Sequence, residues 1–156
     1  MTQARPTGQL DPVSRLQIMS EVIGGVVYAE RYIPSSYQQV WTVVSDLEHQ
    51  LPRLITGLWS FRVAQASPDR LEAQAVGAAG MRVRFDVVLR DGWCLMQSRF
   101  VVGAMAALPE GDGTRLAVLG GLRWRPARPL LWLLRPIGRK RGRVMIDKVE
   151  QQIGPG

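Results

Sequence analysis

Cysteine and histidine are almost missing from this chain: Cys94 and His49 are the only residues of their types among 156. A single cysteine excludes an intramolecular disulfide framework and fits a reducing interior, where it is usually a small buried apolar side chain. One cysteine and one histidine are also too few for a zinc site, which typically takes three or four ligands at defined spacing. We therefore expect no metal and no cofactor.

Long apolar runs are missing as well. Asp11, Pro12 and Glu21 interrupt the first two dozen residues, which excludes a signal peptide or a membrane span there. The strongest run near the C-terminus, Leu130–Leu134, is far shorter than the ~20 residues that a spanning helix needs. The expected location is the cytoplasm. The length and the hydrophobic fraction of 46% are ordinary for one globular domain.

Charge is distributed unevenly along the chain. Residues 1–122 contain eleven basic and eleven acidic residues, and so are neutral overall. Residues 123–156 contain nine basic and two acidic residues, and so carry the whole net charge of +7. This asymmetry predicts a local basic patch on the C-terminal segment rather than a generally basic protein.

The first half of the chain is expected to hold one strand and two short helices. Residues 1–24 read as a polar leader, partly ordered around Leu16–Met19. A β-rich stretch over 26–33 ends at Pro34, and the serines after it can cap a helix. Apolar residues at i, i+3, i+4 and i+7 predict that helix over the following residues. Pro52 is expected to end it, with a second helical turn near 54–58.

After Trp59 the apolar period changes from helical spacing to two, which is typical of strands. The clearest strand is Met81–Leu89, followed by an Asp91-Gly92 hairpin signal. Trp93–Leu108 forms one bent strand or two, and Thr114–Trp124 is the last strand. Hairpin-linked strands with one polar face indicate an antiparallel sheet that is covered on its other side.

A C-terminal amphipathic helix is the expected cover. Pro136 disfavours a helical conformation at the residue before it, so the main helix is predicted to begin at Pro136. Met145, Val149 and Ile153 share one face at a spacing of four residues. Arg135, Arg139 and Arg143 share another at the same spacing. Nothing divides the chain further, so residues 25–153 are predicted to form one domain.

Three stretches carry a resemblance to a known superfamily. The text Ile33–Glu48, which includes Val40-Trp41 and Ser45-Asp46-Leu47-Glu48, resembles the polyketide cyclase/dehydrase and lipid-transport group of the START-like (SRPBCC, Bet v 1-like helix-grip) superfamily. Gly113-Thr114-Arg115 resembles that group's entry to its last strand, and Met145–Glu150 resembles the end of its long helix. The resemblance covers roughly residues 25–153. It implies an α+β helix-grip fold, with a curved antiparallel sheet of six or seven strands around a long C-terminal helix and two short helices after the first strand.

The resemblance also implies a cavity between the concave face of the sheet and the C-terminal helix. Small residues such as Ala73 and Ala75 opposite aromatic ones favour unfilled volume there. The alternative is that these side chains simply pack against each other. The residues predicted to line the cavity are Trp59, Phe61, Val63, Leu71, Met81, Val83, Phe85, Val87, Leu89, Trp93, Met145 and Val149.

Candidate chemical groups are few. If Trp93 and Leu95 point inward, Gln97 and Arg99 also face the cavity, where arginine would stabilise charge on an enolate or carboxylate oxygen. In the alternative register Cys94, Met96, Ser98, Phe100 and Val102 point inward and Arg99 meets solvent. Arg31 has the same ambiguity. The tyrosines Tyr28, Tyr32 and Tyr37 could supply a phenol or lie at the surface, and His49 is expected to be exposed.

The basic segment that includes Arg135, Arg139, Lys140, Arg141 and Arg143 has three interpretations. It lacks the interleaved aromatic residues of a nucleic-acid site, so nucleic acid is not the expected partner. It could meet an anionic membrane surface while Leu130–Leu134 enter the interface. It could also be a solvated helix face.

Two hypotheses for function follow. The first is a protein that binds a lipid, a polyketide or an isoprenoid-like molecule. The second is a polyketide cyclase or aromatase-like enzyme that folds a reactive chain in the same cavity, with Arg99, Arg31 and Gln97 as candidate catalytic residues. The direction of Arg99 separates them, because proton transfer and charge stabilisation need a positioned group that reaches the cavity.

Overall fold

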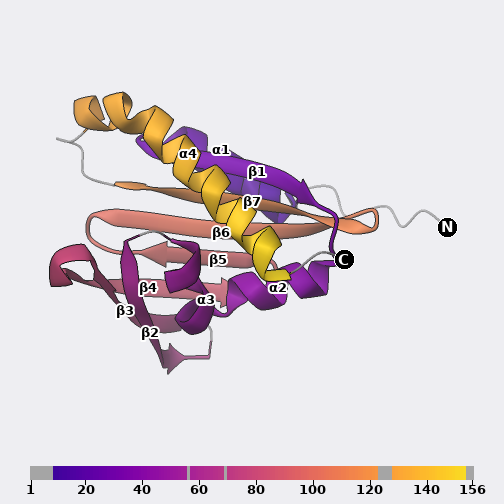
Figure 1. Cartoon of the computed structure of the whole chain (residues 1–156), viewed down its shortest axis with the longest axis horizontal. Coiled ribbons are helices and arrows are strands. Elements are labelled where there is room, and N and C mark those ends of the chain that lie inside the picture. The colour runs from indigo at the N-terminus through magenta and orange to yellow at the C-terminus, as the bar shows by residue number, and fades with distance from the viewer. Residues whose placement is uncertain (1–8, 56, 69, 123–127, 154–156) are drawn as a thin grey trace.

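The computed structural model describes residues 9–55, 57–68, 70–122 and 128–153. It contains a seven-stranded antiparallel sheet, four α-helices and one short 3-10 helix among these residues (Figure 1). In chain order the elements are α1 (Pro12–Ile23), β1 (Val26–Ile33), α2 (Tyr37–Ser45), α3 (Leu47–Leu54), β2 (Leu58–Ser67), β3 (Arg70–Gly77), η1 (Ala78–Gly80), β4 (Arg82–Arg90), β5 (Trp93–Gln97), β6 (Val101–Glu110), β7 (Gly113–Leu122) and α4 (Arg128–Ile153).

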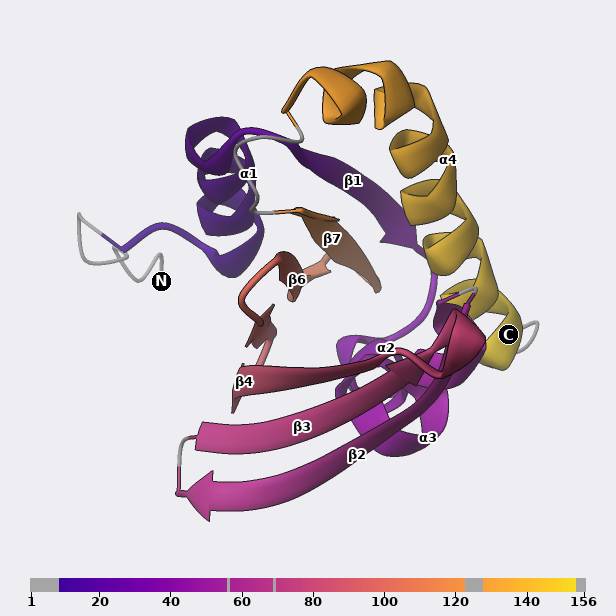
Figure 2. The same cartoon turned by 90° about the vertical axis from the view of Figure 1, so that its left-hand side faces the viewer.

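The sheet has the strand order β1-β7-β6-β5-β4-β3-β2. Six strands from β2 to β7 form a meander, and β1 pairs with β7 at the far side. Figure 2 shows that the sheet curves strongly, with α2, α3 and α4 on its concave side and α1 on its convex side. The predicted α+β architecture, with two short helices after the first strand and a long C-terminal helix, is confirmed.

The two short helices are set by their caps. The Ser36 side chain accepts a hydrogen bond from the backbone amide of Gln39, and the Gln39 side chain accepts one from the backbone amide of Ser36. Helix α2 therefore begins with a capping box. The chain then breaks at Asp46, whose side chain accepts from the His49 amide and starts α3. The prediction that Pro52 ends the first helix is therefore wrong. Pro52 lies inside α3, two residues before its end.

Helix α4 begins earlier than the sequence indicates. It starts at Arg128, so the predicted start at Pro136 is wrong. Pro129 falls in the first turn, where a missing amide hydrogen has no helical partner to lose. Pro136 lies inside the helix, and Figure 2 shows the first turns of α4 inclined to the rest. An interior proline explains such a bend because it cannot donate the helical hydrogen bond.

Part of the predicted leader is a folded helix. Asp11 accepts a hydrogen bond from the Ser14 amide at 2.8 Å, and Pro12 is the first helical residue, so α1 has both of its start signals. Val13 and Leu16 are buried against the convex side of the sheet. The order expected only around Leu16–Met19 therefore extends over the whole of α1. The leader's residues 1–8 lie outside the described residues.

Two apolar clusters lie on opposite faces of the sheet. The larger one occupies the concave face and includes residues of α2, α3 and α4. The smaller one joins α1 to the convex face of β1, β5, β6 and β7. The pleat sends alternate residues to opposite faces, so each strand that crosses both clusters is apolar on both sides.

Candidate functional site

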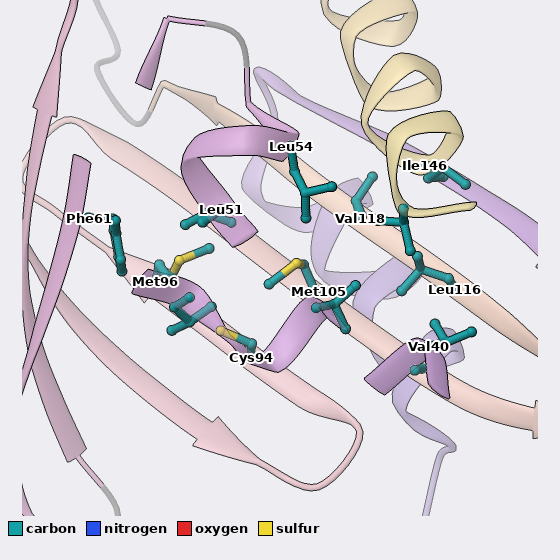
Figure 3. Packing of buried hydrophobic residues seen from close by; sticks show 14 of the residues in the cluster. Val40, Leu51, Leu54, Phe61, Cys94, Met96, Met105, Leu116, Val118 and Ile146 are labelled. Atoms are coloured by element: carbon teal, nitrogen blue, oxygen red, sulfur yellow. The ribbon is translucent and has the colours of Figure 1, made fainter. Parts of the chain in front are cut away.

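The concave face is the candidate site, because it is apolar and is bounded by three helices. Figure 3 shows side chains from the sheet, α2, α3 and α4 converging there. Core positions of α4 are Ile146 and Val149, which are fully buried. The buried members of this cluster are Ile33, Val40, Val44, Leu47, Leu51, Leu54, Phe61, Ala73, Ala75, Val87, Cys94, Met96, Met105, Ala107, Leu116, Val118, Ile146 and Val149.

Phenylalanine and alanine face each other across neighbouring strands of the concave face. Phe61 on β2 pairs with Ala75 on β3, and Phe85 on β4 pairs with Ala73. The two rings lie with centroids 6.0 Å apart at an interplanar angle of 48°. Both alanines are buried, and Phe61 is buried as well. The rings therefore occupy part of the space that the small residues leave, and the predicted cavity remains a prediction.

Other apolar side chains on the same face are only half-buried. They lie on β2, β3 and β4, interspersed with the buried Ala73, Ala75 and Val87, and form an apolar strip along this part of the concave face. Met145 of α4 is half-buried against the same cluster. This strip is the apolar surface that a guest molecule could cover. Its members are Val63, Leu71, Val83, Phe85 and Leu89.

Three residues predicted to line the cavity lie elsewhere. The pairing of β2 with β3 is irregular between Leu58 and Ser60, so Leu58 packs on the concave cluster and Trp59 is 62% exposed. Met81 precedes β4 and is 67% exposed. Trp93 belongs to the convex cluster, where the Arg15 guanidinium of α1 lies 5.1 Å from its ring centroid. Irregular pairing and strand ends explain the first two errors, since the period of two fails there.

The register of β5 determines where Arg99 lies. Cys94 and Met96 are buried in the concave cluster, whereas Trp93 and Leu95 pack on the convex side. The inward register of Trp93 and Leu95 is therefore wrong. Arg99 follows in the turn between β5 and β6, where it is exposed and its guanidinium lies 5.4 Å from the Phe100 ring centroid.

The alternative register is correct for β5 and then ends at the turn. Ser98 holds that turn by accepting a hydrogen bond from the Val101 amide at 2.9 Å. Phe100 is half exposed, and Val102 packs on the convex cluster, so neither continues the inward set. A turn interrupts the alternation of faces, which is why a single period could not describe residues 93–108.

Gln97 lies on the convex face opposite Asp86 of β4. Strand β4 continues beyond the end of β5 at this point, and the step forms an open surface hollow. Gln97 and Arg99, two of the three predicted catalytic residues, therefore lie together, but on the face away from the concave cluster. The hollow is lined by Arg84, Asp86, Gln97, Ser98 and Arg99.

Arg31 does lie on the concave side, but its charge is already paired. Its neighbours at i−2 and i+2, Ala29 and Ile33, both pack on the concave cluster. The Arg31 guanidinium donates hydrogen bonds to Asp147 and to Glu150 of α4, the latter at 3.1 Å. These bonds raise the pKa of Arg31, chiefly through Asp147. Arg31 thus connects β1 to α4.

The remaining candidate groups are also engaged or exposed. The Tyr28 hydroxyl donates to Glu30 and the Tyr37 hydroxyl to Asp91. Tyr32 is exposed, and so is His49, whose ring contacts Asp46. Burial raises the pKa of the Cys94 thiol to about 12. Among the described residues no cluster of metal-ligating side chains occurs.

One buried acceptor on the concave side was not predicted. The Gln50 Oε1 atom on α3 is buried, and it has no hydrogen-bond partner among the described residues. Buried polar atoms are nearly always satisfied, so such an atom needs an explanation. A bound molecule with a hydroxyl or amide hydrogen would supply one. No sequence pattern distinguishes Gln50 from an ordinary polar helix residue.

Sequence reasoning also missed how closely α4 approaches the sheet. A Cβ atom at Gly142 would lie 3.2 Å from the Ala29 Cβ atom and 3.9 Å from Val118 Cγ2. An isolated glycine weakens a helix, so its presence inside α4 indicates that another element packs closely against it. Asp147 and Glu150 are three residues apart and so are neighbours on the surface of α4. This pair of acids was a second indication of a contact with a basic residue such as Arg31.

A curved antiparallel sheet, two short helices and a long helix across the concave face define the helix-grip fold. The chain has this START-like, Bet v 1-like fold, and the resemblance seen in the sequence is confirmed at that level. No family model matches the chain, and no curated protein is similar to it in sequence.

Solved structures with this fold include the protein TTHA0849 and, separately, several proteins described as aromatase/cyclases. The protein TTHA0849 from Thermus thermophilus is 23% identical, with a TM-score of 0.61 over 82% of this chain and 96% of that one. The ZhuI aromatase/cyclase from Streptomyces sp. R1128 is 9% identical, with a TM-score of 0.62 over 82% of this chain and 92% of that one. The di-domain aromatase/cyclase StfQ from the steffimycin biosynthetic pathway is 12% identical, with a TM-score of 0.62 over 81% of this chain. This chain spans 50% of StfQ. At these identities the likeness shows a shared fold.

No helix within the described ranges is both long enough and apolar enough to cross a membrane.

Proposed function

We propose that the domain binds an apolar small molecule, such as a lipid, a polyketide or an isoprenoid-like compound, between the concave face of the sheet and α4. The observation that carries the proposal is the half-buried apolar strip on β2, β3 and β4. Apolar side chains beside a closed core remain within reach of a guest, and covering them stabilises a complex by roughly 25 cal/mol per Å². Ligand sites in proteins are typically concave and apolar in this way.

A single polar contact would orient such a guest. Gln50 Oε1 is a buried acceptor without a partner among the described residues, on a helix of the concave side, so a guest that carries one hydroxyl or protonated carboxyl group fits better than a pure hydrocarbon. Arg31 would stay with its two carboxylates on α4, because breaking those pairs leaves both acids uncompensated.

A pair of neighbouring residues tests the proposal. Val63 lies on the concave face of β2, and Ala64, the next residue, is exposed on the other face. Val63→Glu places a charge in the apolar strip and should weaken binding of the fluorescent fatty acid cis-parinaric acid at least tenfold, because burying an unpaired charge is costly. Ala64→Glu adds the same charge outside the site.

Fluorescence titration of both variants and the parent domain, with circular dichroism to verify folding, provides the measurement. Equal affinity in all three would contradict binding on the concave face. A folded Val63→Thr variant with near-normal affinity would confirm that the charge, rather than a disturbed strand, causes the loss.

The second candidate function is an aromatase/cyclase. Fold neighbours with that description favour it by analogy of fold alone. The concave cluster would then act by restricting the conformations of a reactive chain, with Arg31 as its one predicted catalytic residue on this side. Incubation with a linear poly-β-ketone thioester separates the two functions. Ring formation that is abolished by Val63→Glu would favour the enzyme. Recovery of the unchanged linear thioester would favour a carrier.

A further inference from the structure

Exposed apolar side chains lie on several loops and strand ends at one end of the sheet. Strands β2, β4 and β6 begin there and β3, β5 and β7 end there, so their connections all lie at the same end of the sheet. Figure 1 shows the β5–β6 turn and the start of α4 at this end, which faces the viewer in Figure 2. The apolar side chains there, called the open-end rim below, are Ile55, Trp59, Met81, Phe100 and Leu122.

The apolar side chains of the rim are strongly exposed. Trp59 and Met81 are 62% and 67% exposed, and Phe100 is 50% exposed. Scattered apolar residues are ordinary on protein surfaces, but several at one end of a domain mark a surface that contacts something. The type of residue is informative too, since tryptophan is favoured where one side of a surface is apolar and the other is wet, and phenylalanine is a common apolar anchor at membrane interfaces.

Arginines surround the same rim. Arg53 lies in the last turn of α3, Arg82 is the first residue of β4, and Arg99 lies in the β5–β6 turn. All three are exposed. Helix α4 starts at this end and exposes Lys140, Arg141 and Arg143 farther along. The rim is thus complementary to an anionic surface.

We propose that the open-end rim docks the domain on an anionic lipid surface. Trp59, Met81 and Phe100 enter the interfacial layer, and Arg82 and Arg99 meet lipid phosphates. The spacing favours a bilayer over a protein partner, because the apolar side chains stand on different loops and strand ends rather than on one element. A lipid bilayer can bury separate apolar side chains whatever the distance between them.

This inference goes beyond ligand binding and also extends the sequence-based expectation for the segment with Arg135 and Arg139. The side chains of those two residues lie outside the described part of the chain, so the rim supplies the anchors and α4 adds charge through Lys140, Arg141 and Arg143. An apolar guest could then reach the concave face from the bilayer without crossing water.

Vesicle sedimentation without any added guest tests the docking. The parent domain should sediment with vesicles of phosphatidylcholine that contain about a third phosphatidylglycerol, and should do so weakly with phosphatidylcholine alone. Binding should fall at high salt, because screening shortens the reach of surface charges. Arg82→Glu with Arg99→Glu should lower the partition coefficient more than tenfold, given roughly fivefold for each basic residue near an anionic surface.

Two matched double variants keep the test specific. Arg70 and Arg90 are exposed at the opposite end of β3 and β4, so Arg70→Glu with Arg90→Glu makes the same change in net charge away from the rim. Trp59→Ser with Met81→Ser removes two rim anchors, whereas Leu10→Ser with Ile18→Ser removes two exposed apolar residues before and within α1. Only the rim variants should lose binding.

Three results would overturn the proposal. They are no sedimentation of the parent domain with anionic vesicles, equal loss in the rim and control variants, or full binding by both rim variants. The first of these results would favour a protein partner for the rim. Binding of cis-parinaric acid in solution, measured on the same rim variants, should stay normal, so failure of docking is distinguishable from failure of the proposed ligand site.

Discussion

Arg31 and Arg99 are equivalent candidates in the sequence, since each lies on a strand whose inward face is ambiguous. Their neighbours separate them. Arg31 lies between two residues of the concave cluster and meets the acids of α4, whereas Arg99 lies in a turn on the convex side. The carboxylates of α4, far along the chain, decide the case of Arg31, whereas the pairing of β5 and the turn after it decide the case of Arg99. The catalytic hypothesis therefore loses two of its three residues from the concave face, Arg99 and Gln97.

Alternation of faces predicted the inward residues well wherever a strand is regular. Phe61, Val63 and Phe85 lie as expected because the pleat fixes a period of two. Trp59 fails at an irregular pairing and Met81 fails before its strand begins. These are positions where hydrogen bonding to a neighbouring strand, rather than the pattern of the chain itself, decides the direction of a side chain.

Cys94 provides a test at the scale of one residue. Its side chain is fully buried in the concave cluster, and burial raises the pKa of its thiol from an ordinary 9.0 to about 12. Because the thiolate is the reactive form, the folded domain at pH 8 should react with Ellman's reagent roughly a hundredfold or more slower than the same domain in urea. Rapid reaction of the folded domain would place Cys94 at the surface and reverse the register of β5.

The helices show how caps and prolines compete. Serine at Ser36 predicted α2 correctly because a capping box is a local signal. Pro52 and Pro136 misled the prediction, since both lie inside helices that packing holds in place. Helix α1 was underestimated because its apolar residues do not form one clear stripe: Val13 and Leu16 are buried, whereas Ile18 and Val22 are exposed.

Gly142 tests the contact between α4 and the sheet. Gly142→Leu forces a large side chain against Ala29 and Val118, so it should lower the free energy of unfolding by about 1–3 kcal/mol, as overpacking commonly does. Arg143→Leu, at the exposed neighbouring position, should change the stability by less than about 0.5 kcal/mol. Urea denaturation followed by circular dichroism measures both. Equal stability of the two variants would mean that α4 does not approach the sheet closely at this glycine.

Across the whole molecule the two faces of the sheet have different surroundings. Helices α2, α3 and α4 bound the concave face, α1 covers part of the convex face, and the hollow with Arg84 and Gln97 lies on the convex side. The fold could be predicted because element order and a few motifs specify it. Which charged groups reach the concave face could not, because that depends on contacts between residues far apart in the chain.

The central claim is that an apolar guest binds on the concave face, and nuclear magnetic resonance tests it most directly. Titration of the isotopically labelled domain with cis-parinaric acid should shift the amide signals of Val63, Ala73 and Phe85, together with Val149 on α4, while Arg84 and Gln97 on the convex face stay unchanged. Shifts confined to the convex hollow, or no shifts at saturating guest, would contradict the account.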